Sequence, residues 1–148
     1  MANLSSYLPD GIDESSVQIT GGSINGTTIG ASTPSTGAFT TAVVNTNTDT
    51  SNTGSVTLDF SANQNFVLTL TGNVTLANPS TEIVGQSGFI VFIQDSTGSR
   101  TVSLGTDYET VSGAGLTLSS AASTTDIVPY VVAASGRILL GAPQLAFS

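Results

Sequence analysis

The chain of 148 residues contains no cysteine, no histidine and no tryptophan. Without cysteine it forms no disulfide and offers no thiolate ligand to a metal ion. Without histidine and cysteine, the Ser-His-Asp and Cys-His arrangements of nucleophilic catalysis are impossible. A zinc site would have to be built from carboxylates alone, which is rare for zinc. We therefore expect a protein that is not an enzyme and that holds no metal or other cofactor.

Charge is also scarce. Charged residues make up only 8% of the chain, and the two cationic residues, both arginine, leave a net charge of −8. A nucleic-acid-binding protein needs a basic stripe, and an acidic chain is repelled by anionic lipid surfaces, so we expect neither nucleic acid nor membrane as a partner. Few charges also leave strand edges open to pairing, which favours a protein whose edges are occupied in an assembly.

Long apolar runs are missing as well. None reaches the roughly 18–20 residues that cross a bilayer. The first ten residues lack the basic start and the apolar segment of a secretory signal. We expect the protein to be made in a cytoplasm, whatever its destination.

The residues that remain, mainly Thr, Ser, Gly, Asn and Val, favour strands and turns over helices. Apolar and polar residues alternate after Gly54, which is typical of half-buried strands. Strands are predicted at residues 55–60, 65–70, 74–77, 88–94, 100–104, 127–133 and 137–140, with weaker ones at 108–111 and 115–118. Residues 71–73 are predicted to form a hairpin turn, and the strand at 88–94, apolar on both faces, to be central. The expected fold is all-β, with a small antiparallel β-sandwich or jelly-roll-like domain over residues 55–148.

Residues 17–44 follow a different rule, because an apolar or rigid residue recurs at every fifth position. The series consists of Ile19, Ile24, Ile29, Pro34, Phe39 and Val44. Five is the period of neither a helix nor a flat strand, and it indicates short extended pieces separated by tight turns. Such a ribbon cannot cover its own apolar stripe, so it needs neighbouring chains. We predict an N-terminal assembly arm over residues 1–54, consisting of this ribbon and a polar linker at residues 45–54.

Several side chains are candidates for an assembly interface. Apolar residues before the ribbon either insert into a partner or fold back on the arm, and the two arginines either bridge to acids of a neighbouring subunit or lie on the surface. The candidate interface residues are Tyr7, Leu8, Ile12, Ile19, Ile24, Ile29, Phe39, Val44, Arg100 and Arg137.

Two acidic positions carry alternative interpretations. Asp107 and Glu109 are two residues apart and would share one face of a strand, as the paired carboxylates of a glycoside hydrolase do, but two exposed acids beside a loop are ordinary. Asp95 lies in a Ser/Gly turn, where capping of the turn is favoured over calcium binding.

Two parts of the sequence resemble bacteriophage proteins. Residues 19–30 (ITGGSINGTTIG) with 33–41 (TPSTGAFTT) resemble a segment that recurs in phage tail fibres and other virion proteins. Residues 66–76 (FVLTLTGNVTL) and 98–104 (GSRTVSL) are similar to a small β-domain of phage structural proteins. The resemblance implies a homotrimer in which three ribbons wind round one axis and bury the isoleucine stripe. It also implies a protein made in the host cytoplasm and assembled on the virion.

Within the virion two structural roles are open. The first hypothesis is a trimeric capsid decoration or cement protein that stabilises the head shell, with the major capsid protein or other virion proteins as partners. The alternative is a short tail fibre or fibre subunit involved in host attachment, with a host-surface glycan as a partner. A carbohydrate-binding β-module is less favoured, because a chain with no Trp and three Tyr has few aromatic platforms for sugars.

Overall fold

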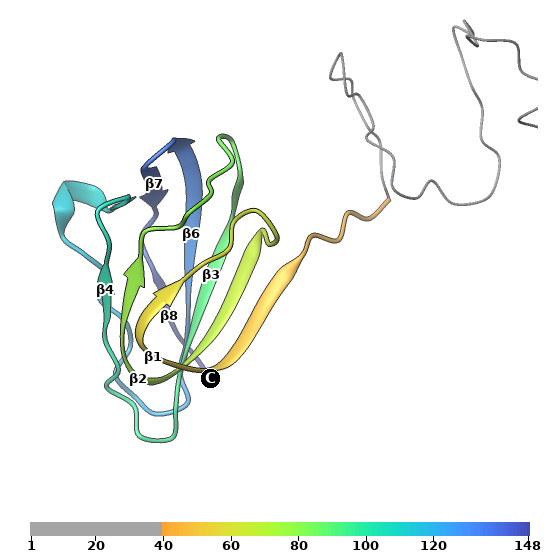
Figure 1. Ribbon diagram of the computed structural model, residues 1–148. Helices are drawn as coiled ribbons and strands as arrows, with labels where there is room; N and C mark the ends of the chain where they lie inside the picture. The colour runs from red at the N-terminus through yellow and green to blue at the C-terminus, as the bar shows by residue number, and fades with distance from the viewer. Residues whose placement is uncertain (1–39) are drawn as a thin grey trace, which may run out of the picture. The chain divides into compact units, whose positions relative to one another are not determined.

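A computed structural model describes residues 40–148, which fold into a set of β-strands (Figure 1). The strands are β1 (Thr46–Thr57), β2 (Asn65–Ala77), β3 (Ser87–Gln94), β4 (Val102–Leu104), β5 (Tyr108–Glu109), β6 (Thr125–Ala134), β7 (Arg137–Leu140) and β8 (Gln144–Phe147). A short 3₁₀ turn, η2 (Val111–Gly113), follows β5. No α-helix occurs in this part of the chain, which therefore contains no helix long and apolar enough to cross a membrane. The prediction of an all-β fold is confirmed.

All eight strands belong to one mixed sheet. Its main order is β1-β2-β3-β6-β7-β5, with β4 added to β2 and β8 added to β6. The pairs β1–β2, β2–β3, β2–β4 and β5–β7 are parallel, whereas β6 is antiparallel to β3, β7 and β8. The prediction of an antiparallel domain is therefore wrong. Side-chain alternation says which residues face inward, but it carries no information on the direction of neighbouring strands.

The sheet is curled, because β1 and β2 bend round one end of the domain (Figure 1). We name the two resulting parts the first layer and the second layer. The first layer contains the N-terminal parts of β1 and β2 with β3, β6 and β7. The second layer contains the C-terminal parts of β1 and β2 with β4. Because β2 returns towards the end at which it began, β3 can start beside it and run parallel without a crossover helix (Figure 1).

The bend in β1 coincides with two register shifts against β2, on either side of Asn52. Asn52 is buried, and its side-chain amide donates to the carbonyl oxygens of Asp49 and Thr69, both at 3.1 Å. Gly54 follows with φ of 68°, a left-handed conformation that glycine adopts without steric cost. The bulges increase the local twist and turn the strand into the second layer.

Two sequence predictions fail at this bend. The segment 45–54, predicted as a polar linker, supplies most of β1, and β1 crosses the predicted boundary between residues 54 and 55. Pairing with β2 and the buried amide of Asn52 hold this strand, so it needs no apolar side chains. Residues 71–73, predicted as a hairpin turn, lie inside the continuous strand β2. Gly72 approaches β1 so closely that an added Cβ would lie 2.2 Å from Oγ1 of Thr53.

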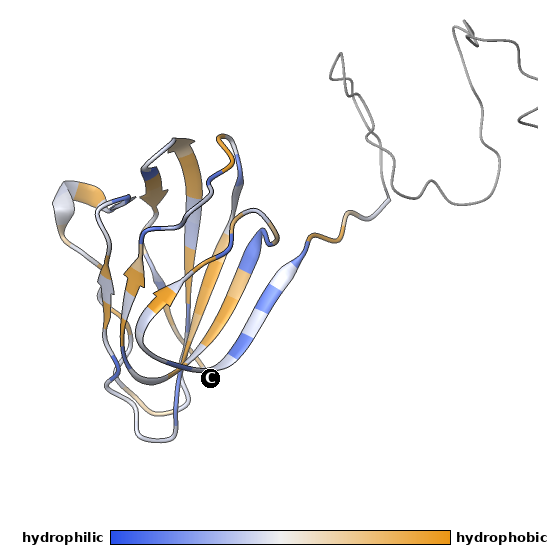
Figure 2. Cartoon of the chain, viewed as in Figure 1, coloured by the Kyte–Doolittle hydropathy of each residue, from blue (hydrophilic) through white to orange (hydrophobic). Residues whose placement is uncertain are grey.

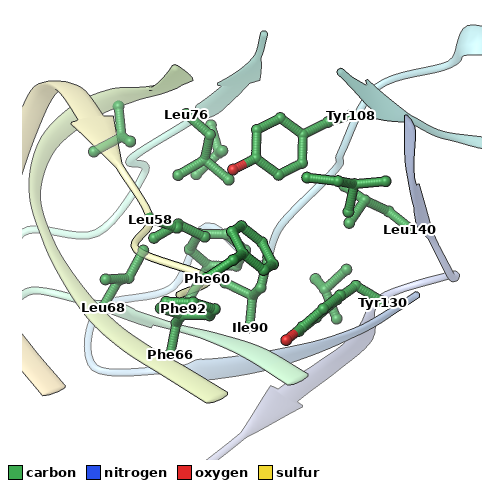
Figure 3. Packing of buried hydrophobic residues seen from close by; sticks show 14 of the residues in the cluster. Leu58, Phe60, Phe66, Leu68, Leu76, Ile90, Phe92, Tyr108, Tyr130 and Leu140 are labelled. Atoms are coloured by element: carbon green, nitrogen blue, oxygen red, sulfur yellow. The ribbon is translucent and has the colours of Figure 1, made fainter. Parts of the chain in front are cut away.

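The core lies between the two layers, and Figure 3 shows its centre. Phe60 packs against the rings of Phe66 and Tyr130, with centroids 5.0 and 5.2 Å apart. Aliphatic residues from both layers surround this cluster: Leu58, Leu68, Leu70, Val74, Leu76, Ile90, Val128, Val132, Ile138 and Leu140. Apolar residues predominate in β3 and β6, whereas the first part of β1 is hydrophilic (Figure 2).

The strands predicted at residues 88–94, 127–133 and 137–140 are present as β3, β6 and β7. The strand at 88–94 is central, because β3 lies between β2 and β6, and β6–β7 is a hairpin with Gly136 in its turn. The strand predicted at 55–60 ends at Thr57. Residues 115–118 form no strand. Leu116 and Leu118 instead pack against the core from a segment without regular structure.

Candidate functional site

The predicted interface residues divide into two groups. Tyr7, Leu8, Ile12, Ile19, Ile24, Ile29 and Phe39 lie outside the described residues, so their role in an arm stays a prediction. Val44, Arg100 and Arg137 lie within them. The two arginines are at opposite ends of β6, because the backbone of Arg100 bonds Gln94 at the end of β3, whereas Arg137 begins β7. The structure therefore does not bring them together.

Arg100 forms an ion pair within its own chain. Its Nη2 lies 2.8 Å from Oδ2 of Asp95. Asp95 Oδ1 also accepts hydrogen bonds from the backbone N–H groups of Thr97 and Gly98, at 3.0 and 2.9 Å. This is an Asx turn, so the interpretation of Asp95 as a capping residue is confirmed. The hydrogen bond from Arg100 lowers the pKa of Asp95, and the same contact raises the pKa of Arg100.

This loop provides a prediction on acid stability. The pKa of Asp95 is lower in the folded chain than its ordinary value of 3.8. The stability that the ionised group contributes is therefore present above about pH 4, and it is lost as pH falls through the folded pKa. We expect Asp95→Asn to lower the thermal midpoint at about pH 7 and to have a smaller effect at about pH 3, which is below the ordinary pKa of 3.8, so that part of this contribution is already lost. Thermal unfolding at the two pH values measures this difference.

Asp107→Asn is the matched control, because this carboxylate has no arginine bonded to it and lies outside the loop. We expect this change to leave the pH dependence close to that of the wild type. An equal effect of Asp95→Asn at both pH values would contradict the assigned role of the ion pair.

Arg137 is also paired within the chain, at 2.8 Å from Oε1 of Glu109, and both side chains are about half exposed. The hydrogen bond from Arg137 to Glu109 joins β7 to β5, and this contact raises the pKa of Arg137. Interchain bridges from the two arginines stay a prediction.

The carboxylates of Asp107 and Glu109 flank Tyr108, whose side chain is buried in the core, so both point away from it. Burial raises the pKa of the Tyr108 hydroxyl. Glu109 is held by Arg137, and Asp107 lies 3.4 Å from the hydroxyl of Thr106. Within residues 40–148 no three acidic, histidine or cysteine side chains gather in a way that would hold a metal ion.

Asp126 is a polar residue that the sequence reasoning missed. It is only 1% exposed, and its carboxylate accepts the N–H and the hydroxyl of Ser119, at 2.6 and 2.7 Å, and the N–H of Ala146, at 2.8 Å. It thereby fastens β8 and the segment before β6 to the sheet. A signal was present, since Asp126 has the same parity as Val128 and Tyr130 and so belongs to the buried face.

Two open grooves lie beside the start of β1. The larger, about 590 Å³, is lined by residues that include Val43, Phe60 and Ile83. The second, about 370 Å³, lies between Val44, Phe89 and Pro129. No charged residue lines either groove. Burial raises the pKa of Tyr130, beside the second groove, to about 12, so this hydroxyl stays protonated and donates to the carbonyl of Gln64 at 2.6 Å. These surfaces suit contact with uncharged or apolar groups.

Residues 9–137 match the family model described as "Putative phage tail fibre C-terminal domain". The chain belongs to this family, and it is a bacteriophage virion structural protein that resembles tail fibres. No curated protein and no solved structure matches the chain.

Proposed function

We propose that the protein is a tail-fibre subunit that works as a homotrimer in attachment of the phage to its host, without enzymatic activity. The observation that carries the proposal is the family match, which extends from residue 9 to residue 137 and so includes most of the chain. It favours the fibre, the alternative of the sequence analysis, over the capsid decoration protein that was the first hypothesis. The family match does not support the cement role.

In this proposal the protein acts through non-covalent contacts with its partners and does not catalyse a reaction. The chain has no histidine and no cysteine, and Glu109, one of the two acids weighed as a catalytic pair, is paired with Arg137. The five-residue series would join copies of the chain, since one ribbon cannot bury its own stripe. The β-domain adds open, uncharged grooves, which suit neutral groups such as the hydroxyls of a host-surface glycan. Other virion proteins are the further partners expected of a fibre.

Electron microscopy of virions labelled with an antibody against the purified protein tests this role. We expect label on the tail and none on the head, with virions from phage lacking the gene as the control. The protein added free should also compete with phage for attachment to host cells, because it would occupy the same receptor. Label confined to the head would overturn the fibre assignment in favour of a capsid decoration protein.

A further inference from the structure

The two layers of the sheet present very different outer faces. In the second layer, Ser55, Thr75 and Ser103 are adjacent in register and exposed. In the first layer the corresponding row consists of Val67, Val91 and Ile127. Both rows belong to strands whose alternate residues fill the same core, so the core does not require this difference. Along this row of β2, β3 and β6, the first layer is apolar on its outer face as well as its inner one.

Two further registered pairs extend this row. Phe89 lies opposite Pro129, and Val131 lies opposite Leu139. Phe89 is 49% exposed and Val131 is 39% exposed. We name the surface formed by Val67, Phe89, Val91, Ile127, Pro129 and Val131 the apolar outer face. Scattered apolar residues on a surface are ordinary, but neighbouring ones on adjacent strands form a continuous patch that is typical of an interface.

The apolar outer face differs from the chain as a whole in having no charged residue. None of its six residues is charged, although the chain has a net charge of −8. Charged groups lie at its border, where Glu109 is in register with Leu139 and forms the ion pair with Arg137. An apolar centre with a polar border is the usual arrangement of a protein interface. Two copies of this acidic chain would meet here with little like-charge repulsion.

The face is also continuous with the five-residue series. Val44, the last member of that series, lines the same groove as Phe89 and Pro129 at the border of the apolar outer face. The stripe that the sequence predicts to need other copies of the chain therefore ends beside a second surface of the same chemistry.

We propose that the apolar outer face packs against the β-domain of a second copy of this chain, so that self-association includes the sheet and is not confined to the arm. This inference rests on the proposed function in one respect, that the fibre contains several copies. The partner is a second copy because the face is neutral in an acidic chain and adjoins the end of the series. A receptor or another virion protein on this face is an alternative that the following experiment excludes or supports.

The absence of cysteine permits a direct test in the full chain, since one introduced thiol is unique. Phe89→Cys and Val131→Cys place it on the apolar outer face, and Val111→Cys, a position 80% exposed on η2, is the control. In the purified protein we expect a maleimide to label the two face thiols about tenfold more slowly than the control, which corresponds to about 1.4 kcal/mol in favour of the covered state.

Equal labelling of all three thiols in purified protein would overturn the proposal. Face thiols that are free in purified protein but protected on virions would likewise overturn it, and would assign the face to a different virion protein.

Sedimentation of two aspartate variants measures the same association independently. Val91→Asp places a charge on the apolar outer face, and Ser103→Asp places one on the outer side of the second layer as the control. Only the first should lower the association state, with circular dichroism showing that both variants are folded. Antibody label on the tail together with free face thiols would retain the fibre assignment and reject this interface.

Discussion

Replacing Phe60 with alanine is expected to lower the free energy of unfolding by about 3–5 kcal/mol. Phe60 follows β1 in the connection to β2, is 1% exposed, and meets Tyr130 edge-on at an interplanar angle of 90°. Its ring fills the space between the two layers beside Phe66 (Figure 3). Alanine would leave a cavity there, because strands on both sides hold the walls apart. The loss combines the transfer of the ring to water with the contacts that the cavity lining no longer makes.

Urea unfolding followed by circular dichroism measures this change. Phe60→Leu is the matched variant, since it keeps an apolar side chain of intermediate size and should lose much less. If Phe60→Ala were as stable as Phe60→Leu, the ring would not be the packing centre that the structure indicates.

The second large effect is expected at Asp126. Asp126→Ala removes the buried carboxylate that accepts three hydrogen bonds and leaves the N–H groups of Ser119 and Ala146 without their partner, so we expect the free energy of unfolding to fall by roughly 2–3 kcal/mol. We also expect local destabilisation of β8, because the N–H of Ala146 in β8 donates to this carboxylate. Hydrogen exchange should show faster exchange of the amides of Ser119 and Ala146, while the amides at the centre of β3 change less.

Asp126→Asn keeps the size of the side chain and removes its negative charge. The amide keeps one oxygen as an acceptor but turns an NH₂ group towards a donor, so we expect a stability between the wild type and Asp126→Ala. Unchanged exchange at Ala146 in both variants would show that β8 is held by other contacts.

The sequence predicted the three long strands that carry most of the core. The segments predicted at residues 65–70, 88–94 and 127–133 correspond to β2, β3 and β6, because recurring apolar residues mark segments that must be buried. The same rule failed for residues 46–54 of β1, which contain only one buried side chain, that of Asn52. Pairing along the β2 edge and a buried amide hold that part of the strand. Such contacts depend on residues distant in sequence, so a local pattern does not show them.

The contacts of the candidate site were also predictable only where they join residues close in sequence. Asp95 was predicted to cap its turn, because an Asx turn depends on residues within three positions, and the structure confirms it. The partners of the two arginines were not predicted, since Glu109 and Arg137 meet only through the parallel pairing of β5 and β7. The apolar outer face could not be recognised either, because its neighbouring valines come from three different strands.

The sequence by itself determined that this is an all-β chain without lysine, histidine or cysteine, and its five-residue series and phage-like segments indicated a virion protein built for assembly. These properties follow from composition and from local periodicity. Only the tertiary structure decided that β1 and β2 bend into both layers, that the sheet is mixed, and that Val67, Val91 and Ile127 lie side by side on an outer surface. The reason is physical: strand direction and register are set by backbone hydrogen bonds between distant segments, and the same alternating sequence satisfies more than one such arrangement.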